Sequence, residues 1–146
     1  MESNTPQNTE STQKPFKVSK SVRLSEGSHT GTVVSVEFRT PPEHKYNYTD
    51  LYIAVDNWEF DGDNGKELGQ LKAGVATNFT ENAQLVQLMI AFGKQVKIDD
   101  EFTEEEVKNV FVGKKVKFVV FDKAGKDKQG RPATYSNIVQ GSLKCI

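Results

Sequence analysis

Residues 78–93 read NFTENAQLVQLMIAFG, and they form the one long amphipathic pattern in the chain. Their apolar side chains recur at spacings of one, three, four and seven, which places them on one face of an α-helix. Asn78 or Thr80 can cap the start of this helix, and Gly93 can end it because glycine adopts a left-handed backbone at little cost. The spacing predicts a helix over 78–93 with one apolar face against a core. That face comprises Leu85, Val86, Leu88, Met89 and Phe92.

Three stretches with strand character precede this helix and two follow it. In the first, Val34, Val36 and Phe38 alternate with polar residues and are expected to face the core. In the second, the alternation places Tyr52 and Trp58 together on the side away from the core. The five predicted strands cover residues 29–39, 49–60, 70–77, 114–121 and 133–140.

The order of these elements indicates the fold. A helix between the third and fourth of five strands is typical of the OB-fold, a small closed barrel that commonly binds oligonucleotides or oligosaccharides. We therefore predict an all-β fold with one main α-helix, built as a five-stranded OB-fold-like barrel. A short second helix is expected after Thr103, which stands in capping-box spacing with Glu106.

The ends of the chain differ in composition. Residues 1–20 are rich in Ser, Thr, Gln and Asn and lack hydrophobic periodicity. Such a segment cannot offset its ordering entropy by burial, so we expect a disordered tail over 1–20 and a folded domain over 21–146.

Charge is unevenly distributed along the chain. The formal net charge is −1, yet six carboxylates lie within residues 99–106, and eight lysines and arginines lie within residues 112–146. One face is therefore expected to be basic and another acidic, although both runs are also compatible with an ordinary solvated surface. The single cysteine, Cys145, suits a reducing compartment, and no apolar run reaches the ~20 residues that span a bilayer. We expect a cytoplasmic protein without membrane contact.

Motifs for catalysis are lacking in the sequence. His29 and His44 have no partners at metal-ligand spacing, and no glycine-rich phosphate loop or nucleophile elbow occurs. The turn region over 61–69 does not fit the spacing of a calcium loop. We expect a non-enzymatic protein with no catalytic residue, metal or cofactor.

A binding cleft is predicted instead. In a five-stranded OB barrel, the second and third strands form its floor, and the loops after the first and fourth strands form its sides. Here those loops are residues 40–48 and 122–132, and the second is expected to flex. Single-stranded nucleic acid requires cations along the phosphates and aromatic rings under the bases. The candidate residues are Arg39, Lys45, Tyr46, Tyr48, Tyr52, Trp58, Lys72, Lys117, Lys123, Lys126, Lys128, Arg131 and Tyr135.

Several runs of the chain also resemble a known family. They are LSEG at 24–27, GTVVSVEF at 31–38, YTDLYIAVD at 48–56, the 78–93 helix, VGKKVKFVVF at 112–121 and GRPATYSNIV at 130–139. Together they look like the single-stranded DNA-binding proteins of phages and mobile elements, over residues 22–140. The resemblance implies an OB-fold that coats single-stranded DNA in replication or recombination. It also implies replication or recombination proteins as further partners, and it is compatible with oligomers of the chain.

Two hypotheses follow. The first is a single-stranded DNA-binding protein with little sequence preference, of phage or mobile-element type. The alternative is a non-catalytic protein- or sugar-binding β module, such as a virion component, with an aromatic contact patch. That patch would comprise Tyr46, Tyr48, Tyr52 and Trp58.

Overall fold

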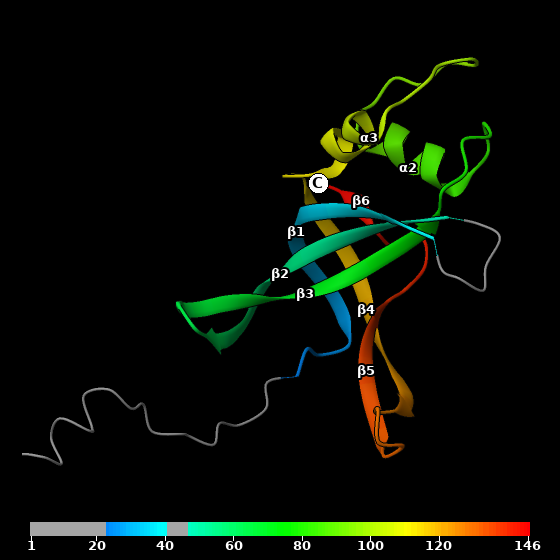
Figure 1. The fold of residues 1–146 in the computed structure, drawn as a ribbon. Helices are drawn as coiled ribbons and strands as arrows, with labels where there is room; N and C mark the ends of the chain where they lie inside the picture. The colour runs from blue at the N-terminus through cyan, green and yellow to red at the C-terminus, as the bar shows by residue number, and fades with distance from the viewer. Residues whose placement is uncertain (1–22, 41–46) are drawn as a thin grey trace, which may run out of the picture.

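The computed structural model describes residues 23–40 and 47–146 of the chain. The tail predicted over 1–20 therefore lies outside the described residues, as do the candidate residues Lys45 and Tyr46. The strands are β1 Gly27–Arg39, β2 Tyr48–Gly62, β3 Gly65–Ala76, β4 Lys115–Lys126, β5 Pro132–Ile138 and β6 Lys144–Cys145 (Figure 1). The helices are α2 Gln84–Ala91 and α3 Glu104–Phe111.

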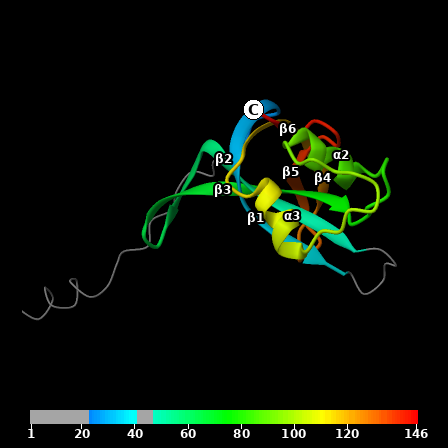
Figure 2. The same ribbon diagram turned by 90° about the horizontal axis from the view of Figure 1, so that it is seen from above.

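The strands form one antiparallel sheet that curls into a barrel. Hydrogen-bonded neighbours follow the order β3-β2-β1-β4-β5, with the short β6 paired to β4. β3 and β5 contact each other across the remaining side, and in the described part of the chain no ladder joins them. α2 and α3 follow β3 and cover one end of the barrel (Figures 1 and 2). The predicted OB-fold-like barrel, with a helix between the third and fourth strands, is confirmed.

The apolar face of the 78–93 segment packs against the barrel core as predicted. Leu85, Met89 and Phe92 belong to a buried cluster with side chains of β1, β2, β3 and β4, because their spacing puts them on the inner side of α2. Gly93 ends the helix with a φ of 99°, and the next amide, that of Lys94, donates to the Met89 carbonyl at 3.0 Å. This stop is the glycine cap that the sequence predicts.

The predicted start of this helix is wrong. α2 begins at Gln84, six residues after Asn78, and no side chain caps it. The Asn78 side chain instead accepts a hydrogen bond from the Thr80 amide at 3.0 Å, and the Ala83 amide donates to the Thr80 carbonyl at 2.9 Å. Asparagine competes with helix formation through such local bonds, so residues 78–83 form turns.

α3 carries the predicted capping box. The Thr103 hydroxyl accepts from the Glu106 amide at 3.1 Å, and the Glu106 carboxylate accepts from the Thr103 amide at 3.0 Å. The bond from the Thr103 amide to the charged carboxylate lowers the pKa of Glu106, and the Thr103 side chain lowers it further.

β1 departs from the predicted alternation. A bulge between Val33 and Ser35 shifts its register with β2, so Val33 is buried while Val34 is exposed. The prediction that Val34 faces the core is therefore wrong, because the extra residue of a bulge reverses the faces on either side of it. Val36 remains in the core.

Candidate nucleic-acid interface

The outer face of β1, β2 and β3 carries four of the predicted site residues. In β2, Thr49, Leu51 and Ile53 point into the barrel and are buried, so Tyr48 and Tyr52 point outward. Tyr52 lies directly opposite Lys72 of β3, and Tyr48 lies opposite Arg39 of β1. The structure therefore brings Arg39, Tyr48, Tyr52 and Lys72 together.

Arg39 is fixed in place on this face by two neighbours. Its Nε donates to Asp50 Oδ2 at 2.7 Å, and its guanidinium lies 4.9 Å from the centre of the Tyr48 ring. The hydrogen-bonded Asp50 carboxylate raises the pKa of Arg39. Gly74 leaves the space for that carboxylate, because a Cβ at this position would lie 2.8 Å from Asp50 Oδ1. The outer face thus holds a buried carboxylate under Arg39.

Tyr52 lies in a partly desolvated and acidic setting. Burial raises the pKa of its hydroxyl, and the nearby carboxylates of Glu37 and Asp50 raise it further. These two carboxylates balance the positive charges of Arg39 and Lys72, so this part of the face is not strongly basic.

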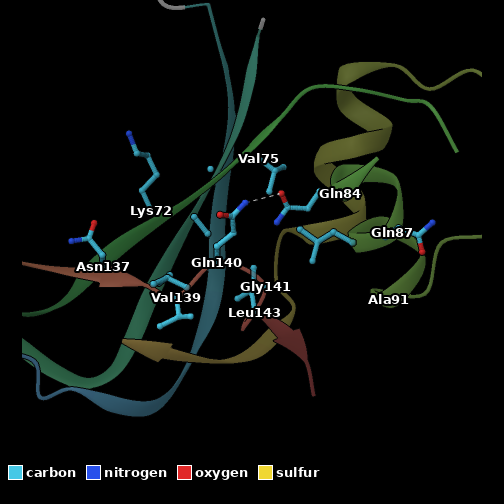
Figure 3. A pocket seen from close by; sticks show the side chains of 14 residues that line it. Lys72, Val75, Gln84, Gln87, Ala91, Asn137, Val139, Gln140, Gly141 and Leu143 are labelled. Atoms are coloured by element: carbon cyan, nitrogen blue, oxygen red, sulfur yellow. Dashed lines mark hydrogen bonds between the residues drawn. The ribbon is translucent and has the colours of Figure 1, made fainter. Parts of the chain in front are cut away.

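The same outer surface continues from β3 to β5. A cavity of about 450 Å³ lies between these two strands under α2, and both Lys72 and Asn137 line it (Figure 3). Ile138 packs against the core, so its neighbour Asn137 faces outward, opposite the exposed Phe121 of β4. Tyr135, two residues before Asn137, lies on this face as well.

Lys123 and Tyr135 extend the surface onto a second hairpin. They stand directly opposite each other in the β4–β5 ladder. The Tyr135 ring lies over Gly125, where a Cβ would be 3.2 Å from the ring, and its hydroxyl donates to the Lys126 carbonyl at 2.9 Å. We use the name tyrosine surface for the combined outer face. It comprises Tyr48, Tyr52, Lys72, Asn137, Phe121, Tyr135 and Lys123.

The predicted flexible loop over 122–132 is largely strand. β4 continues to Lys126, and the connection to β5 is a tight turn organised by Asp127. The Asp127 carboxylate accepts from the amides of Gln129 and Arg131, both at 2.9 Å, and from Arg131 Nε at 2.9 Å. These bonds lower the pKa of Asp127. Lys123 and Lys126 are therefore held on a strand, and Arg131 is engaged within the turn.

Trp58 does not share a face with Tyr52, and that prediction is wrong. Asn57 adopts a left-handed backbone with a φ of 66°, and the β2–β3 register shifts between Ala54 and Glu59. Trp58 consequently lies on the core side of β2 and packs against the core. A Cβ at Gly69, which alternates with the buried Leu71 in β3, would lie 2.5 Å from the Trp58 ring.

Two further predicted cations lie apart from the tyrosine surface. Lys117 stands opposite Thr30 on the β1–β4 side of the barrel, where Thr30 donates to Asp56 at 2.7 Å. Lys128 lies in the turn beyond β4. The structure places neither next to Tyr52.

Sequence reasoning missed four residues of this region. Glu37 and Asp50 bring negative charge to the face, and Phe121 and Asn137 join its two halves. The alternation of Val116, Phe118 and Val120 already indicates that Phe121, the last residue of the predicted strand, faces outward. Nothing local reveals Asp50, because its partner Arg39 lies on a different strand.

Other features of the described residues bear on chemistry. Within residues 23–40 and 47–146, no three His, Cys, Asp or Glu side chains lie close enough to hold a metal ion together. Neither described helix is long and apolar enough to cross a membrane. No protein-family model matches the chain, and no curated protein is similar enough in sequence to count as a relative.

Proposed function

We propose that this protein binds single-stranded DNA across the tyrosine surface, with little sequence preference and without catalysis. The observation that carries the proposal is the continuity of that surface. Tyr52 on β2 and Tyr135 on β5 lie on one outer face of the barrel, joined by Lys72 and Asn137 at the β3–β5 cavity. Aromatic faces with cations between them match the alternation of bases and phosphates along a single strand.

The aromatic groups supply binding that does not depend on sequence. Every base has a π-face, so stacking on Tyr52, Tyr135 or the exposed Phe121 discriminates little between bases. A duplex hides those faces in its own stack. The surface therefore favours single strands over duplex.

The lysines of the β4–β5 hairpin also favour single-stranded DNA as the ligand. Lys123, Lys126 and Lys128 form no ion pair among the described residues, and they lie beside or beyond Tyr135. Phosphates contacted here release condensed counterions, which adds salt-dependent affinity. We infer a role in coating single-stranded DNA during replication or recombination, in the cytoplasm of the cell in which the protein is made.

The balanced charge around Tyr48 and Tyr52 favours a second candidate. With Glu37 and Asp50 opposing Arg39 and Lys72, this patch also suits a sugar or a protein segment, whose binding relies less on charge. Salt separates the two candidates, because phosphate binding weakens steeply as salt increases.

The deciding experiment is a titration of the full chain into fluorescein-labelled oligo-dT and into duplex of equal length, followed by anisotropy at several salt concentrations. We expect tight binding to oligo-dT, weak binding to duplex, and a log-log salt slope that reflects several phosphate contacts. Binding that is absent, or equal for duplex and single strand, contradicts the proposal. The double variant Tyr52→Ala/Tyr135→Ala should lose most of the affinity, while Tyr52→Phe/Tyr135→Phe should keep it.

A further inference from the structure

A second hollow lies at the helical end of the barrel, and Gln87 of α2 lines both this hollow and the β3–β5 cavity. It has a volume of about 750 Å³ and lies between α2, the turns before it and the loop that leads to α3. Three large apolar side chains that line it are exposed: Phe79 at 46%, Ile90 at 45% and Ile98 at 69%. Apolar side chains gathered around one hollow mark an interaction surface more often than scattered ones do. We call this hollow the α2 groove.

The walls of the α2 groove are already formed. Phe79 stacks on Phe102 with ring centres 6.3 Å apart, and Lys94 Nζ lies 5.5 Å from the centre of the Phe102 ring. The buried Val86 of α2 contributes to the lining. A ligand would therefore meet apolar walls that are ordered before it binds, which lowers the entropic cost of docking.

The lining of the groove also carries acidic side chains. Glu81, Asp99 and Asp100 line it together with Lys97, whose amide donates to Asp100 Oδ2 at 2.8 Å. Glu101 follows directly in the sequence. Carboxylates around an apolar hollow select a ligand in which apolar side chains stand between lysines or arginines.

The chain itself contains such a segment. Residues 14–20 read KPFKVSK, and residues 11–22 carry three lysines and no Asp or Glu. Phe16 and Val18 are two positions apart, so in an extended chain both point to one side while Lys17 points to the other. We propose that the α2 groove binds residues 14–20 of a second copy of this chain, with Phe16 and Val18 against its apolar walls and the lysines at its carboxylates.

The position of Arg23 favours a second copy over the same chain. Arg23 binds Asp122 at 3.0 Å and the Thr134 carbonyl at 3.0 Å, and both partners belong to the β4–β5 hairpin. The five residue-to-residue steps from Val18 to Arg23 span at most roughly 18 Å. The seven strand steps from Lys115, which follows α3, to Asp122 already cover about 23 Å, and the groove lies beyond them at the helical end.

Such a contact joins unlike surfaces of two copies, so it repeats instead of closing into a symmetric dimer. In free solution it predicts concentration-dependent association into short chains. If the proposed function holds, the same contact makes coating of single-stranded DNA cooperative, and only this last consequence rests on that function.

The test of the contact uses three proteins and no DNA, so its failure leaves DNA binding untouched. One variant lacks residues 1–20, and the other is Ile90→Glu/Ile98→Glu. Sedimentation velocity of the parent should show association that increases with concentration, and each variant alone should remain monomeric. An equimolar mixture of the two variants should form heterodimers and nothing larger, because only one intact tail–groove contact is available per pair. A parent that stays monomeric at high concentration, or a variant that associates like the parent, overturns the proposal.

A peptide probe checks the partners of the contact separately. A labelled peptide of residues 11–22 should bind the protein that lacks residues 1–20, and its affinity should fall several-fold as salt is raised. Ile90→Glu/Ile98→Glu should abolish this binding, whereas Val112→Glu/Ile146→Glu, also at exposed apolar positions but outside the groove lining, should not. A peptide with Phe16→Ser and Val18→Ser is the matched control and should not bind.

A milder variant keeps the test valid if the glutamates at Ile90 and Ile98 disturb folding. Glu81→Gln/Asp99→Asn alters only exposed acidic side chains and should weaken peptide binding while flattening its salt dependence. Unchanged peptide affinity in this variant and in the isoleucine variant would overturn the proposal.

Discussion

Arg39 Nε and Asp50 Oδ2 lie 2.7 Å apart on the outer face of the barrel, and the Asp50 side chain is only 1% exposed. The ion pair is thus asymmetric, since Arg39 remains about half exposed while its partner is covered. A buried carboxylate depends on its cation, because removal of one partner leaves an uncompensated charge in a desolvated site. Arg39 therefore has a structural role before any role in binding.

Arg39→Gln should lower the melting temperature, and Asp50→Asn/Arg39→Gln should restore part of it because no buried charge is left. Lys72→Gln, an exposed position on the same face, should leave the melting temperature nearly unchanged. In DNA titrations the two single variants should rank in the opposite order, with the larger effect for Lys72→Gln. Lys72→Gln should make the salt slope shallower by about 0.7, the value for one phosphate contact, while Arg39→Gln should change it less since Asp50 already neutralises Arg39. Thermal melts of the parent and the three variants measure the effect on stability, and salt titrations measure the effect on DNA binding. Equal salt slopes for Lys72→Gln and Arg39→Gln would contradict the mainly structural role of Arg39.

Tyr52→Ala should weaken oligo-dT binding by about 1–3 kcal/mol, or roughly 5- to 150-fold in Kd, if a base stacks on this ring. Tyr52→Phe preserves the ring and should bind like the parent. Trp58 lies on the opposite side of β2, so its fluorescence should change little when oligo-dT is added. A strong quench of this single tryptophan would place the DNA path on the core side of the β2–β3 hairpin instead.

Gly69→Ala should destabilise the protein, because the added methyl would lie 2.5 Å from the Trp58 ring and 2.6 Å from the Phe60 ring. Overpacking of this kind costs about 1–3 kcal/mol. Gly125→Ala is the graded control, since its Cβ would meet the Tyr135 ring at 3.2 Å and smaller shifts suffice. Urea unfolding should rank parent above Gly125→Ala above Gly69→Ala, and a blue or red shift of the Trp58 emission is expected only for Gly69→Ala.

The sequence predicts the architecture well because it depends on patterns repeated over many residues. The alternation of Leu51, Ile53 and Val55 identifies the core side of β2, and the spacing of Leu85 and Met89 identifies the inner side of α2. A pattern repeated over several residues still identifies the buried face when one residue departs from it. The five main strands, the position of the helix and its buried face could therefore be read from the chain, whereas the two-residue strand β6 is too short to leave such a pattern.

The candidate site could be predicted only in part, because single residues reverse the pattern. The left-handed backbone of Asn57 moves Trp58 to the core side, and the bulge after Val33 moves Val34 to the outside. Asparagine tolerates that backbone more often than most residues, yet nothing in the neighbouring residues requires it here. The joining of Tyr52 and Tyr135 depends on barrel closure between β3 and β5, which is a property of the whole fold.

Glu106→Gln should reveal a pH-dependent contribution of the capping box in α3. The pKa of Glu106 is lowered in the folded chain, so its carboxylate stabilises the fold above the ordinary pKa of about 4.3, and this stabilisation is lost as the pH falls through the lowered value. Glutamine preserves the capping geometry and removes the charge. The parent should therefore be more stable than Glu106→Gln at pH 7, and the two should converge in acid. Glu105→Gln controls for loss of one charge in the same turn, and a difference that persists unchanged at low pH would exclude this explanation.

The cations of the β4–β5 hairpin should not contribute equally to DNA binding. Arg131 is bound by Asp127 within the turn, whereas Lys123, Lys126 and Lys128 form no ion pair among the described residues. Changing the three lysines to alanine should weaken binding uniformly across oligonucleotide sequences. It should also make the log-log salt slope shallower by roughly two units, at about 0.7 per phosphate contact.

Arg131→Ala should leave the slope almost unchanged but loosen the turn, which hydrogen exchange of the Gln129 and Arg131 amides would detect. Thermal stability of the triple variant should barely change, because exposed charges contribute little to the fold. A triple variant that binds oligo-dT with the parent's slope would remove this hairpin from the path of the DNA and leave Lys72 as the cation that joins the two halves of the tyrosine surface.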